Sequence, residues 1–391
     1  MIRGVIPTFA TAITMLVLAP IAALAQSDDL IVEKNTFELA TYATVAGATI
    51  KNVRIGWEAA GTLNVDKSNA ILITQFFSGT SHAFGKYAES DTAAGYWNSI
   101  IGPGKPIDTN KYYVLSSDTL VNLNVNARNV VTTGPATVNP DTGEPYGMTF
   151  PVVSIKDFVN VQKALIDSLG IRKLKAVVGA SMGGLQAYEW AASYPDMVER
   201  IVPVISSAGT DAFLIGWLDI WAQPIRLDPK WNGGDYYGKE PPLEGLKAAL
   251  KIITLQSNQM EWADKTFARS PAEDGKDPGK AMGNRFKIEA SLESTAAARA
   301  ATVDANHLLY LAKANQLAAA DPSKIKAPAL ILYSPTDLVF QVPLVEHTVK
   351  AIADTGAGVV ETDQLPGPNG HLNGVLAIAQ AGAKISAFLA K

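Results

Sequence analysis

The sequence contains no cysteine, and it has only four histidines among its 391 residues. The absence of cysteine excludes disulfides, cysteine-ligated zinc, iron–sulfur clusters and cysteine nucleophiles. Charged residues make up only 18%, and the formal net charge is 33 − 37 = −4. This weak and slightly acidic charge predicts no binding to nucleic acid. A catalytic histidine must be one of His82, His307, His347 and His371.

Two common cofactor signatures are also missing. The chain has no H-E-x-x-H motif for a metal and no G-x-x-x-x-G-K-[ST] loop for a phosphate. Four histidines scattered along the sequence make a poor set of metal ligands. We therefore expect chemistry on a small molecule that needs no cofactor.

The N-terminal segment has the features of a secretory signal peptide. Arg3 is its only charged residue, and an apolar run extends from Ala12 to Ala23. This run is too short to span a bilayer comfortably. Ala23-Leu24-Ala25 fits the small-x-small cleavage rule. We predict cleavage after Ala25 and a periplasmic or secreted protein that is not attached to a membrane. An uncleaved anchor or a buried helix is the alternative.

Short apolar runs without alternation are typical of strands that are buried on both faces of a parallel sheet. A hairpin is predicted over 36–62, with its turn at Ala46-Gly47-Ala48. Helical spacing over 155–169 ends at Gly170. Strands alternating with helices predict an α/β fold with a mostly parallel, doubly wound sheet. The buried runs lie at 70–76, 112–117, 175–180, 201–206, 329–334 and 359–362.

This alternation breaks once, between residues 207 and 326. The stretch has helical patterns and no buried strand, and it carries four of the seven tryptophans. We predict a helical cap, or lid, inserted between two parts of the core, 26–206 and 327–391. A separate C-terminal domain that begins near Ser207 is the alternative. The weakly charged, aromatic-rich cap favours an apolar or uncharged substrate.

The chemistry is predicted at Gly179-Ala180-Ser181-Met182-Gly183, which matches G-x-S-x-G. A predicted strand precedes this motif, and a predicted helix over 184–193 follows it. This is the context of a nucleophile elbow, a sharp turn that presents a serine at the carboxyl edge of a sheet. A tight turn with an idle serine is the alternative. A catalytic serine needs a base to remove its proton.

Chain order selects the base, because the acid and then the histidine follow the serine in folds with this elbow. His82 precedes Ser181, His347 lies in a helical pattern among charged residues, and His307 lies inside a cap helix. His371 lies in a loop between the last predicted strand and the final helix. We therefore predict His371 as the base.

The acid is predicted to follow the strand over 329–334. Asp337 occupies that turn, and Asp363, after the last strand, is the fallback. Its carboxylate would hold the tautomer of His371 and stabilise the imidazolium.

An oxyanion hole needs two backbone N–H groups aimed at the developing negative charge. We predict that Met182, directly after the nucleophile, donates one of them. The loop after the strand over 70–76 would donate the other, from Phe77, with Phe76 as the alternative.

The chain resembles the homoserine O-acetyltransferase family of α/β-hydrolase-fold proteins from about Tyr42 to its C-terminus. The resemblance implies a catalytic triad at Ser181, Asp337 and His371, and an oxyanion loop at 75–79 with Phe77 as donor. It also implies a homodimer packed through the caps. The segments that carry it are 56–64, 96–118, 133–159, 179–204, 228–237 and 303–314.

Several positions depart from the family pattern. Ala222 stands where the resemblance implies a substrate-binding arginine, and Leu372 stands where it implies an aspartate for the amino group of homoserine. Gln75 replaces the histidine that begins the oxyanion loop. Arg226, one helical turn from Ala222, is either a substitute for the missing arginine or a solvent-facing residue.

One further argument concerns the reaction. Acetyl-CoA is a cytosolic donor that an exported protein would not meet. The sequence therefore favours an exported serine hydrolase that acts on a carboxylic ester or a related acyl compound through an acyl-enzyme. The alternative is an O-acyltransferase of the homoserine O-acetyltransferase type. A third hypothesis is a catalytically silent relative that binds a ligand through the cap.

Overall fold

The computed structural model describes residues 30–356 and 359–391. The predicted signal peptide, 1–25, lies outside the described residues. Among those described, no single helix is long and apolar enough to cross a membrane. The bent pair formed by Gly370–Leu376 and Ile378–Ala390 passes the length and composition test together.

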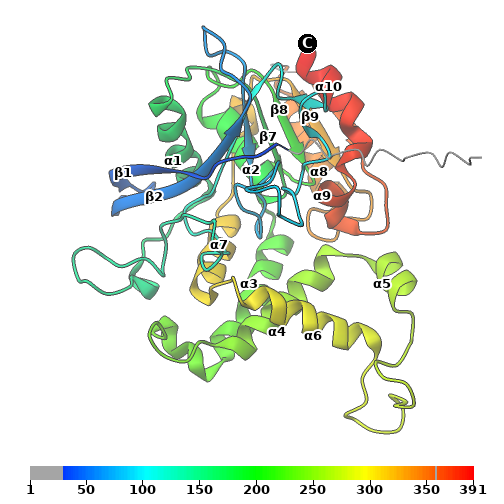
Figure 1. Cartoon of the computed structure of the whole chain (residues 1–391). Coiled ribbons are helices and arrows are strands. Elements are labelled where there is room, and N and C mark those ends of the chain that lie inside the picture. Colours follow the sequence, from blue (N-terminus) through cyan, green and yellow to red (C-terminus); the bar gives the residue numbers. More distant parts are fainter. Residues whose placement is uncertain (1–29, 357–358) are drawn as a thin grey trace, which may run out of the picture.

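An eight-stranded sheet forms the centre of the core (Figure 1). Its strand order is β1-β2-β6-β3-β7-β8-β9-β10. The pairs β1/β2 and β2/β6 are antiparallel, and the other neighbours are parallel. The strands are β1 Asn35–Ala43, β2 Thr49–Ala60, β3 Ala70–Thr74, β6 Tyr113–Ser117, β7 Leu174–Ala180, β8 Ile201–Val204, β9 Ala329–Tyr333 and β10 Val360–Gln364. This is the predicted α/β-hydrolase architecture of a mostly parallel sheet.

Side chains alternate between the two faces of the sheet, so each face has its own hydrophobic core. Leu72 packs into one core, and its neighbours Ile71 and Ile73 pack into the other. The helices that contribute to the Leu72 core are α1 Ile155–Ser168, α2 Met182–Ser193 and α8 Val342–Ala353. Helix α10, Gly382–Ala390, contributes to the opposite core. Helices on both faces confirm the doubly wound arrangement.

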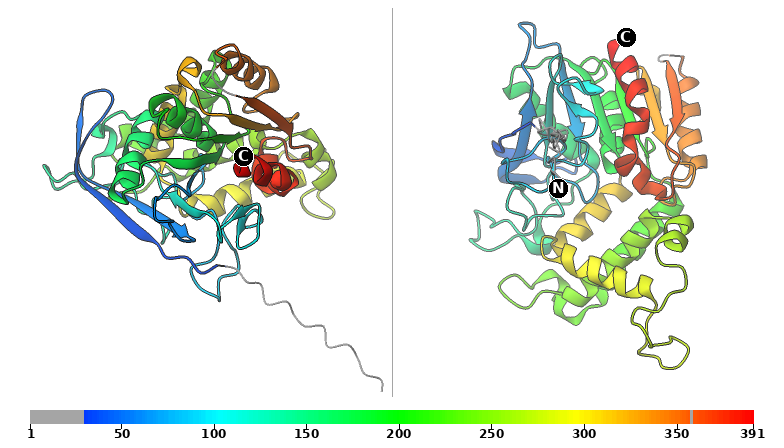
Figure 2. Two further views of the ribbon diagram at one scale, coloured as in Figure 1. Left: turned by 90° about the horizontal axis from the view of Figure 1, so that it is seen from above. Right: turned by 45° about the vertical axis from the view of Figure 1, so that its right-hand side comes forward.

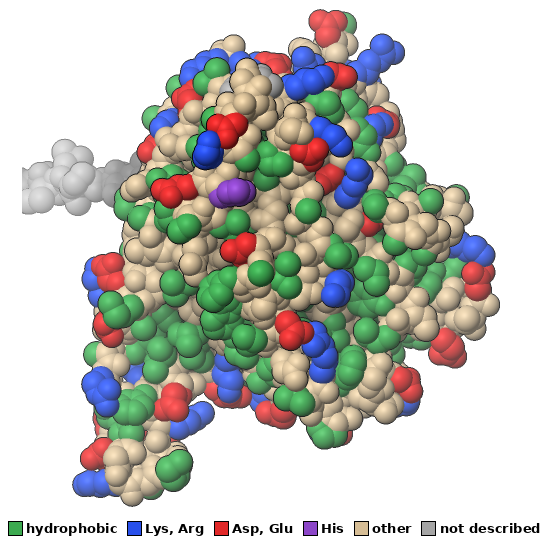
Figure 3. Space-filling model, turned by 180° about the vertical axis from the view of Figure 1, so that it is seen from behind, with side chains coloured by type: hydrophobic (Ala, Val, Ile, Leu, Met, Phe, Trp, Pro, Cys, Tyr) green, Lys and Arg blue, Asp and Glu red, His purple; other side chains and the backbone are tan. Residues whose placement is uncertain are grey.

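Five helices lie between β8 and β9, within the stretch 207–326 that was predicted to form a cap. They are α3 Ala212–Leu227, α4 Leu243–Ser257, α5 Met260–Thr266, α6 Lys287–Ala300 and α7 Ala305–Gln316. Figure 2 shows this cap beneath one edge of the sheet. Hydrophobic side chains gather on the cap half of the face in Figure 3.

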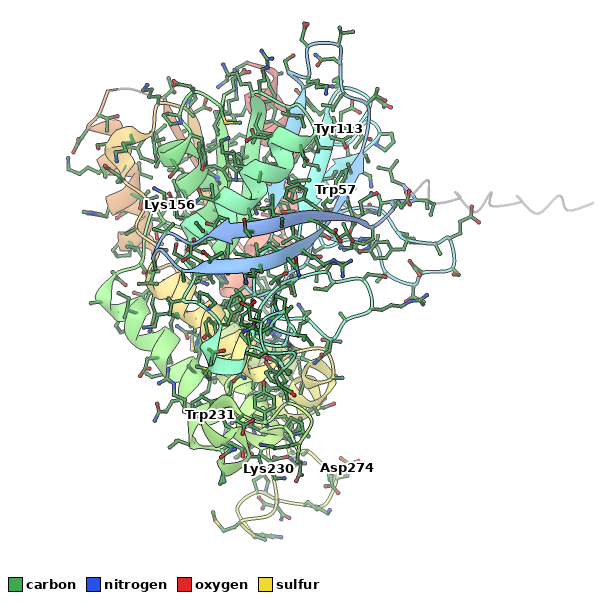
Figure 4. All side chains as sticks on the ribbon, turned by 90° about the vertical axis from the view of Figure 1, so that its left-hand side faces the viewer. Trp57, Tyr113, Lys156, Lys230, Trp231 and Asp274 are labelled. Atoms are coloured by element: carbon green, nitrogen blue, oxygen red, sulfur yellow. The ribbon has the colours of Figure 1, made fainter. Side chains whose placement is uncertain are left out.

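A loop over 269–286 projects from the cap. Its ends are joined by a bridge between Pro271 and Phe286, and Arg269 lies over the Phe286 ring. Asp274 marks this loop in Figure 4, beyond Lys230 and Trp231 on the body of the cap.

The structure departs from the predicted elements at a few ends. Helix α2 begins at Met182 rather than at Gly184, so the helix starts directly after the serine. Strand β8 ends at Val204, because Ile205 adopts a left-handed backbone with φ of 48°. A separate pair of two-residue strands, β4 Ile101–Gly102 and β5 Ile107–Asp108, was not predicted. The remaining ordered pieces are η1 Gly147–Thr149, η2 Pro229–Gly234, η3 Pro322–Lys324, η4 Gly370–Leu372, α9 Asn373–Leu376 and η5 Ile378–Ala381.

Candidate active site

Ser181 occupies a strained turn between β7 and α2. Its backbone has φ of 56° and ψ of −120°, a conformation that residues with a side chain rarely adopt. Three glycines permit the turn because each approaches its neighbours too closely for a Cβ. A Cβ on Gly179 would overlap the Thr74 side chain, and one on Gly183 would overlap the Thr74 carbonyl. A Cβ on Gly184 would overlap Ser206. These close approaches account for the three glycines around the serine.

His371 and Asp337 complete a continuous chain of hydrogen-bond contacts with this serine. The Nε2 atom of His371 lies 2.8 Å from Ser181 Oγ, and its Nδ1 atom lies 2.7 Å from Asp337 Oδ2. All three side chains are buried. The structure thus brings together the three residues predicted from chain order, in the geometry by which a base can take the serine proton.

Backbone contacts fix the acid. The other carboxylate oxygen of Asp337, Oδ1, accepts N–H bonds from Val339 at 2.7 Å and Phe340 at 3.0 Å. The Phe340 ring also stacks on the imidazole of His371, with 5.9 Å between ring centroids. These contacts leave Oδ2 directed at the histidine.

A buried asparagine holds the histidine turn. Asn373 donates to Ser334 Oγ and to the carbonyl of Gly367, both at 3.0 Å, and it accepts the N–H of Asn369 at 3.2 Å. Gly370 adopts φ of 57°, which allows the sharp turn just before His371. The base is therefore anchored to the end of β9.

The two predicted oxyanion donors come from different elements. Met182 is the first residue of α2, and Phe77 lies in the loop that follows β3. Within the described part of the chain, neither backbone N–H has an acceptor. Buried N–H groups without a partner are uncommon, so these two are suited to receive a developing negative charge.

A buried polar network, which sequence reasoning missed, holds the oxyanion loop. Gln75 donates to Thr119 Oγ1 at 2.9 Å, accepts from Asn122 at 3.0 Å, and its carbonyl accepts from Gln186 at 3.0 Å. Asn124 donates to the carbonyl of Ser78 at 3.0 Å. The only signal in the sequence was a run of polar residues directly after the β6 strand.

A second buried cluster supports the same loop from β2. Glu58 accepts from Ser81 Oγ at 2.8 Å and lies 3.0 Å from the Nδ1 atom of His82. Burial raises the pKa of Glu58, but the His82 hydrogen bond and the Lys34 ammonium outweigh it and hold the pKa at about 2. His82, which chain order rejected as the base, therefore belongs to this cluster.

The cap closes over the site through two side chains. Trp221 of α3 packs edge-on against Phe77, and its indole N–H donates to Gln256 Oε1 at 2.6 Å. Gln256 in turn donates to the carbonyl of Leu338, beside the acid, at 3.2 Å. An apolar groove of about 480 Å³ opens there, lined by Phe213, Trp217, Ile220, Ile252, Leu255, Gln256, Leu338 and Gln341.

The predicted substrate contacts have different surroundings. Ala222 is buried in α3, and Leu372 is half-buried directly after the base. Arg226 is exposed and pairs with Asp219 of the same helix at 2.8 Å. This surface pair with Asp219 favours the solvent-facing alternative for Arg226 over a contact with the substrate.

The remaining candidates lie away from the serine. His307 is completely buried, with its Nδ1 2.7 Å from the carbonyl of Asn122. His347 is exposed on α8. Asp363, the fallback acid, pairs with Lys384 at 3.3 Å. Neither His307 nor Asp363 contacts the other predicted catalytic residues.

Comparison with known proteins shows the family of the chain. The α/β hydrolase fold family model matches residues 131–345, which is more than half of the chain. The crystal structure of homoserine O-acetyltransferase from Bacillus anthracis is 35% identical with a TM-score of 0.88, covering 93% of this chain and 98% of that chain.

The chain belongs to the homoserine O-acetyltransferase family of the α/β-hydrolase fold.

Members of this group carry different names. The homoserine O-acetyltransferase of Methanococcoides burtonii is 41% identical over 268 residues, or 68% of this chain. That match covers 54% of the relative, so the chain spans about half of its length. The crystal structure of esterase E22 is 45% identical with a TM-score of 0.88, covering 92% of this chain and 100% of that chain.

Proposed function

We propose that this protein is a serine-dependent O-acyltransferase of the homoserine O-acetyltransferase type. The observation that carries the proposal is the Ser181–His371–Asp337 contact chain in a member of this family. The names of the relatives support acyl transfer better than the exported hydrolase that the sequence favoured.

The first half of the reaction would acylate the serine. His371 takes the Ser181 proton while Oγ attacks the acyl carbonyl, and the N–H groups of Met182 and Phe77 stabilise the oxyanion. The protonated His371 then gives its proton to the departing alcohol or thiol. Asp337 keeps the imidazolium oriented throughout.

The second half would pass the acyl group to an alcohol. His371 removes the proton of the acceptor hydroxyl, the acceptor oxygen attacks the acyl-enzyme, and Ser181 recovers its proton as the new ester leaves. Ala222 and Leu372 provide no charge for the carboxylate and ammonium of homoserine. The acceptor is therefore proposed to be an alcohol other than a free amino acid.

Ester hydrolysis is the second candidate, with water as the acceptor. Two observations favour it: the 45% identity to the structure of esterase E22, and the absence of charged side chains at Ala222 and Leu372. The acyl-enzyme is common to both reactions, so only the partition of the acyl group separates them.

Partition of the acyl group is the test. The protein is incubated with p-nitrophenyl acetate, alone and with homoserine or a neutral alcohol, and both the acylated acceptor and free acetate are quantified. Acceptor acylation that exceeds acetate release supports transfer. Acetate release that no alcohol diminishes supports hydrolysis instead, and Ser181→Ala is the inactive control.

Export after cleavage at Ala25 and pairing through the caps stay predictions, to be checked by N-terminal sequencing and by sedimentation.

A further inference from the structure

Arg299 is a half-buried cation of the cap that has no acidic partner among the described residues. It lies in the last turn of α6, and its Nη1 donates to Thr254 Oγ1 of α4 at 3.1 Å. Within residues 30–356 and 359–391, no carboxylate lies at ion-pair distance from this guanidinium. By contrast, Lys247 and Lys251 on the same helix pair both engage Glu293, at 3.1 and 2.8 Å.

Two sets of contacts connect the helices that carry Arg299 and Thr254 to the loops of the active site. Helix α4 ends against the histidine turn, where the backbone of Asn258 stands next to Gly370 and Gln259 donates to the carbonyl of Pro368 at 2.8 Å. Thr254 lies one helical turn before this contact.

Helix α6 ends against the oxyanion loop. Thr302, three residues after Arg299, donates to Asn124 Oδ1 at 3.3 Å, and Asn124 donates to the carbonyl of Ser78 at 3.0 Å. Arg299 and Thr254 therefore contact each other near the ends of two helices, one of which leads to the histidine turn and the other to the asparagine that holds the oxyanion loop.

The partial burial of Arg299 has a cost in free energy that a bound anion would reduce. A guanidinium stays protonated at neutral pH, and burying it without a counter-ion is costly. Burial also lowers the pKa of Arg299, as expected for a desolvated cation. An anion that enters with the substrate would remove that cost.

We propose that Arg299, assisted by Thr254, binds a carboxylate carried by the substrate. This rests on the proposed acyl transfer at Ser181. The substrate class is an ester or alcohol that bears a carboxylate and no ammonium group, because Leu372 offers no charge for an ammonium. This replaces the uncharged substrate that the cap composition favoured.

The test compares isosteric esters. The monomethyl ester of succinate differs from methyl butyrate in carrying a carboxylate at the end of the acyl chain, and methanol is too poor a leaving group for that carboxylate to displace on its own. Arg299→Gln should lower kcat/KM for the succinate ester roughly 10- to 100-fold, mainly through KM, and leave the butyrate ester unchanged. Arg299→Lys should retain part of the preference. Lys251→Gln, which alters a paired cation on α4, should retain all of it.

A second arm places the carboxylate on the acceptor. Transfer to γ-hydroxybutyrate is compared with transfer to 1-pentanol in the same variants. Selective loss in either arm supports the proposal and tells which half of the substrate carries the anion. An equal fall for charged and neutral compounds in both arms would show that Arg299 only packs the helix ends, and would overturn it.

Binding separates this inference from the reaction itself. Calorimetry with Ser181→Ala and the succinate ester measures the carboxylate contact without turnover. Binding that weakens about tenfold or more in Ser181→Ala/Arg299→Gln supports the contact even if the wild-type protein transfers no acyl group. Equal binding by the two variants would refute it.

Discussion

The ammonium of Lys34 lies 3.0 Å from Glu58 and 3.2 Å from Asp118, two carboxylates that are completely buried. Asp118 accepts the N–H of Ser81 at 2.9 Å, at the end of the oxyanion loop. Burial raises the pKa of Asp118, and the Lys34 charge opposes that rise. A residue near the start of the described chain thus stabilises the support of the oxyanion loop.

Lys34→Met should destabilise the protein by about 3–5 kcal/mol, because it leaves two buried carboxylates without a cation. The loss should be larger at alkaline than at mildly acidic pH. Without Lys34 the pKa of Asp118 rises further, so the folded state binds more protons than the unfolded chain, and its stability falls as the pH rises. Denaturant unfolding at about pH 5 and 8 measures this. Lys51→Met, which breaks the exposed pair with Asp141, is the control and should change little. A loss independent of pH would contradict the argument.

His307 should make the fold sensitive to acid. Burial lowers the pKa of His307, which accepts the Ala136 N–H at Nε2 and stays neutral. Below about pH 6.5 the unfolded chain takes up a proton that the folded state does not. The free energy of unfolding therefore decreases as the pH is lowered, by at most about 1.4 kcal/mol per pH unit. His307→Gln should flatten the dependence of unfolding free energy on pH. The exposed His347→Gln should leave the slope intact, and equal slopes in all three proteins would rule out this role.

Asp337→Asn should lower kcat for p-nitrophenyl acetate roughly 10³- to 10⁴-fold with little change in KM, because the imidazolium of His371 would lose its partner. Asp363→Asn is the matched control, since its carboxylate pairs with Lys384 instead. Steady-state kinetics on both variants decide between them. A larger loss of kcat in Asp363→Asn than in Asp337→Asn would show that Asp363, and not Asp337, is the catalytic acid.

Gly183→Ala should reduce both stability and activity. The added Cβ would overlap the carbonyl of Thr74, and relieving that overlap would shift the elbow at a cost of about 1–3 kcal/mol. Gly216→Ala is a suitable contrast, because no atom lies within 4 Å of its Cβ position on α3. That substitution should stabilise the helix by up to about 1 kcal/mol. Thermal unfolding measures the stability of the two variants, and kcat measures their activity. If Gly183→Ala changed neither quantity, the elbow would tolerate the movement.

The sequence predicted the sheet, the cap region and the three residues of the Ser181 contact chain, because each depends on local pattern or on chain order. Short apolar runs in the sequence indicate buried strands, and glycines on both sides of a serine indicate the elbow. It did not predict that α2 starts at Met182, since helix ends depend on which backbone groups find partners. The sequence left two alternatives open for Arg226, because it could not show that Arg226 pairs with the exposed Asp219 of the same helix.

The sequence by itself determined the elbow at Ser181 and the order of its acid and base, because short-range sterics and chain direction allow few alternatives. Only the tertiary structure decided which charges meet. Lys34 and Asp118 are 84 residues apart, and their pairing depends on β2, which lies between β1 and β6 and aligns the start of β1 with the end of β6. In the cap, the packing of α6 on α4 leaves Arg299 beside Thr254 with no carboxylate at ion-pair distance among the described residues. Charge pairing acts over a few ångströms, whereas the pattern of a sequence specifies contacts reliably only between near neighbours.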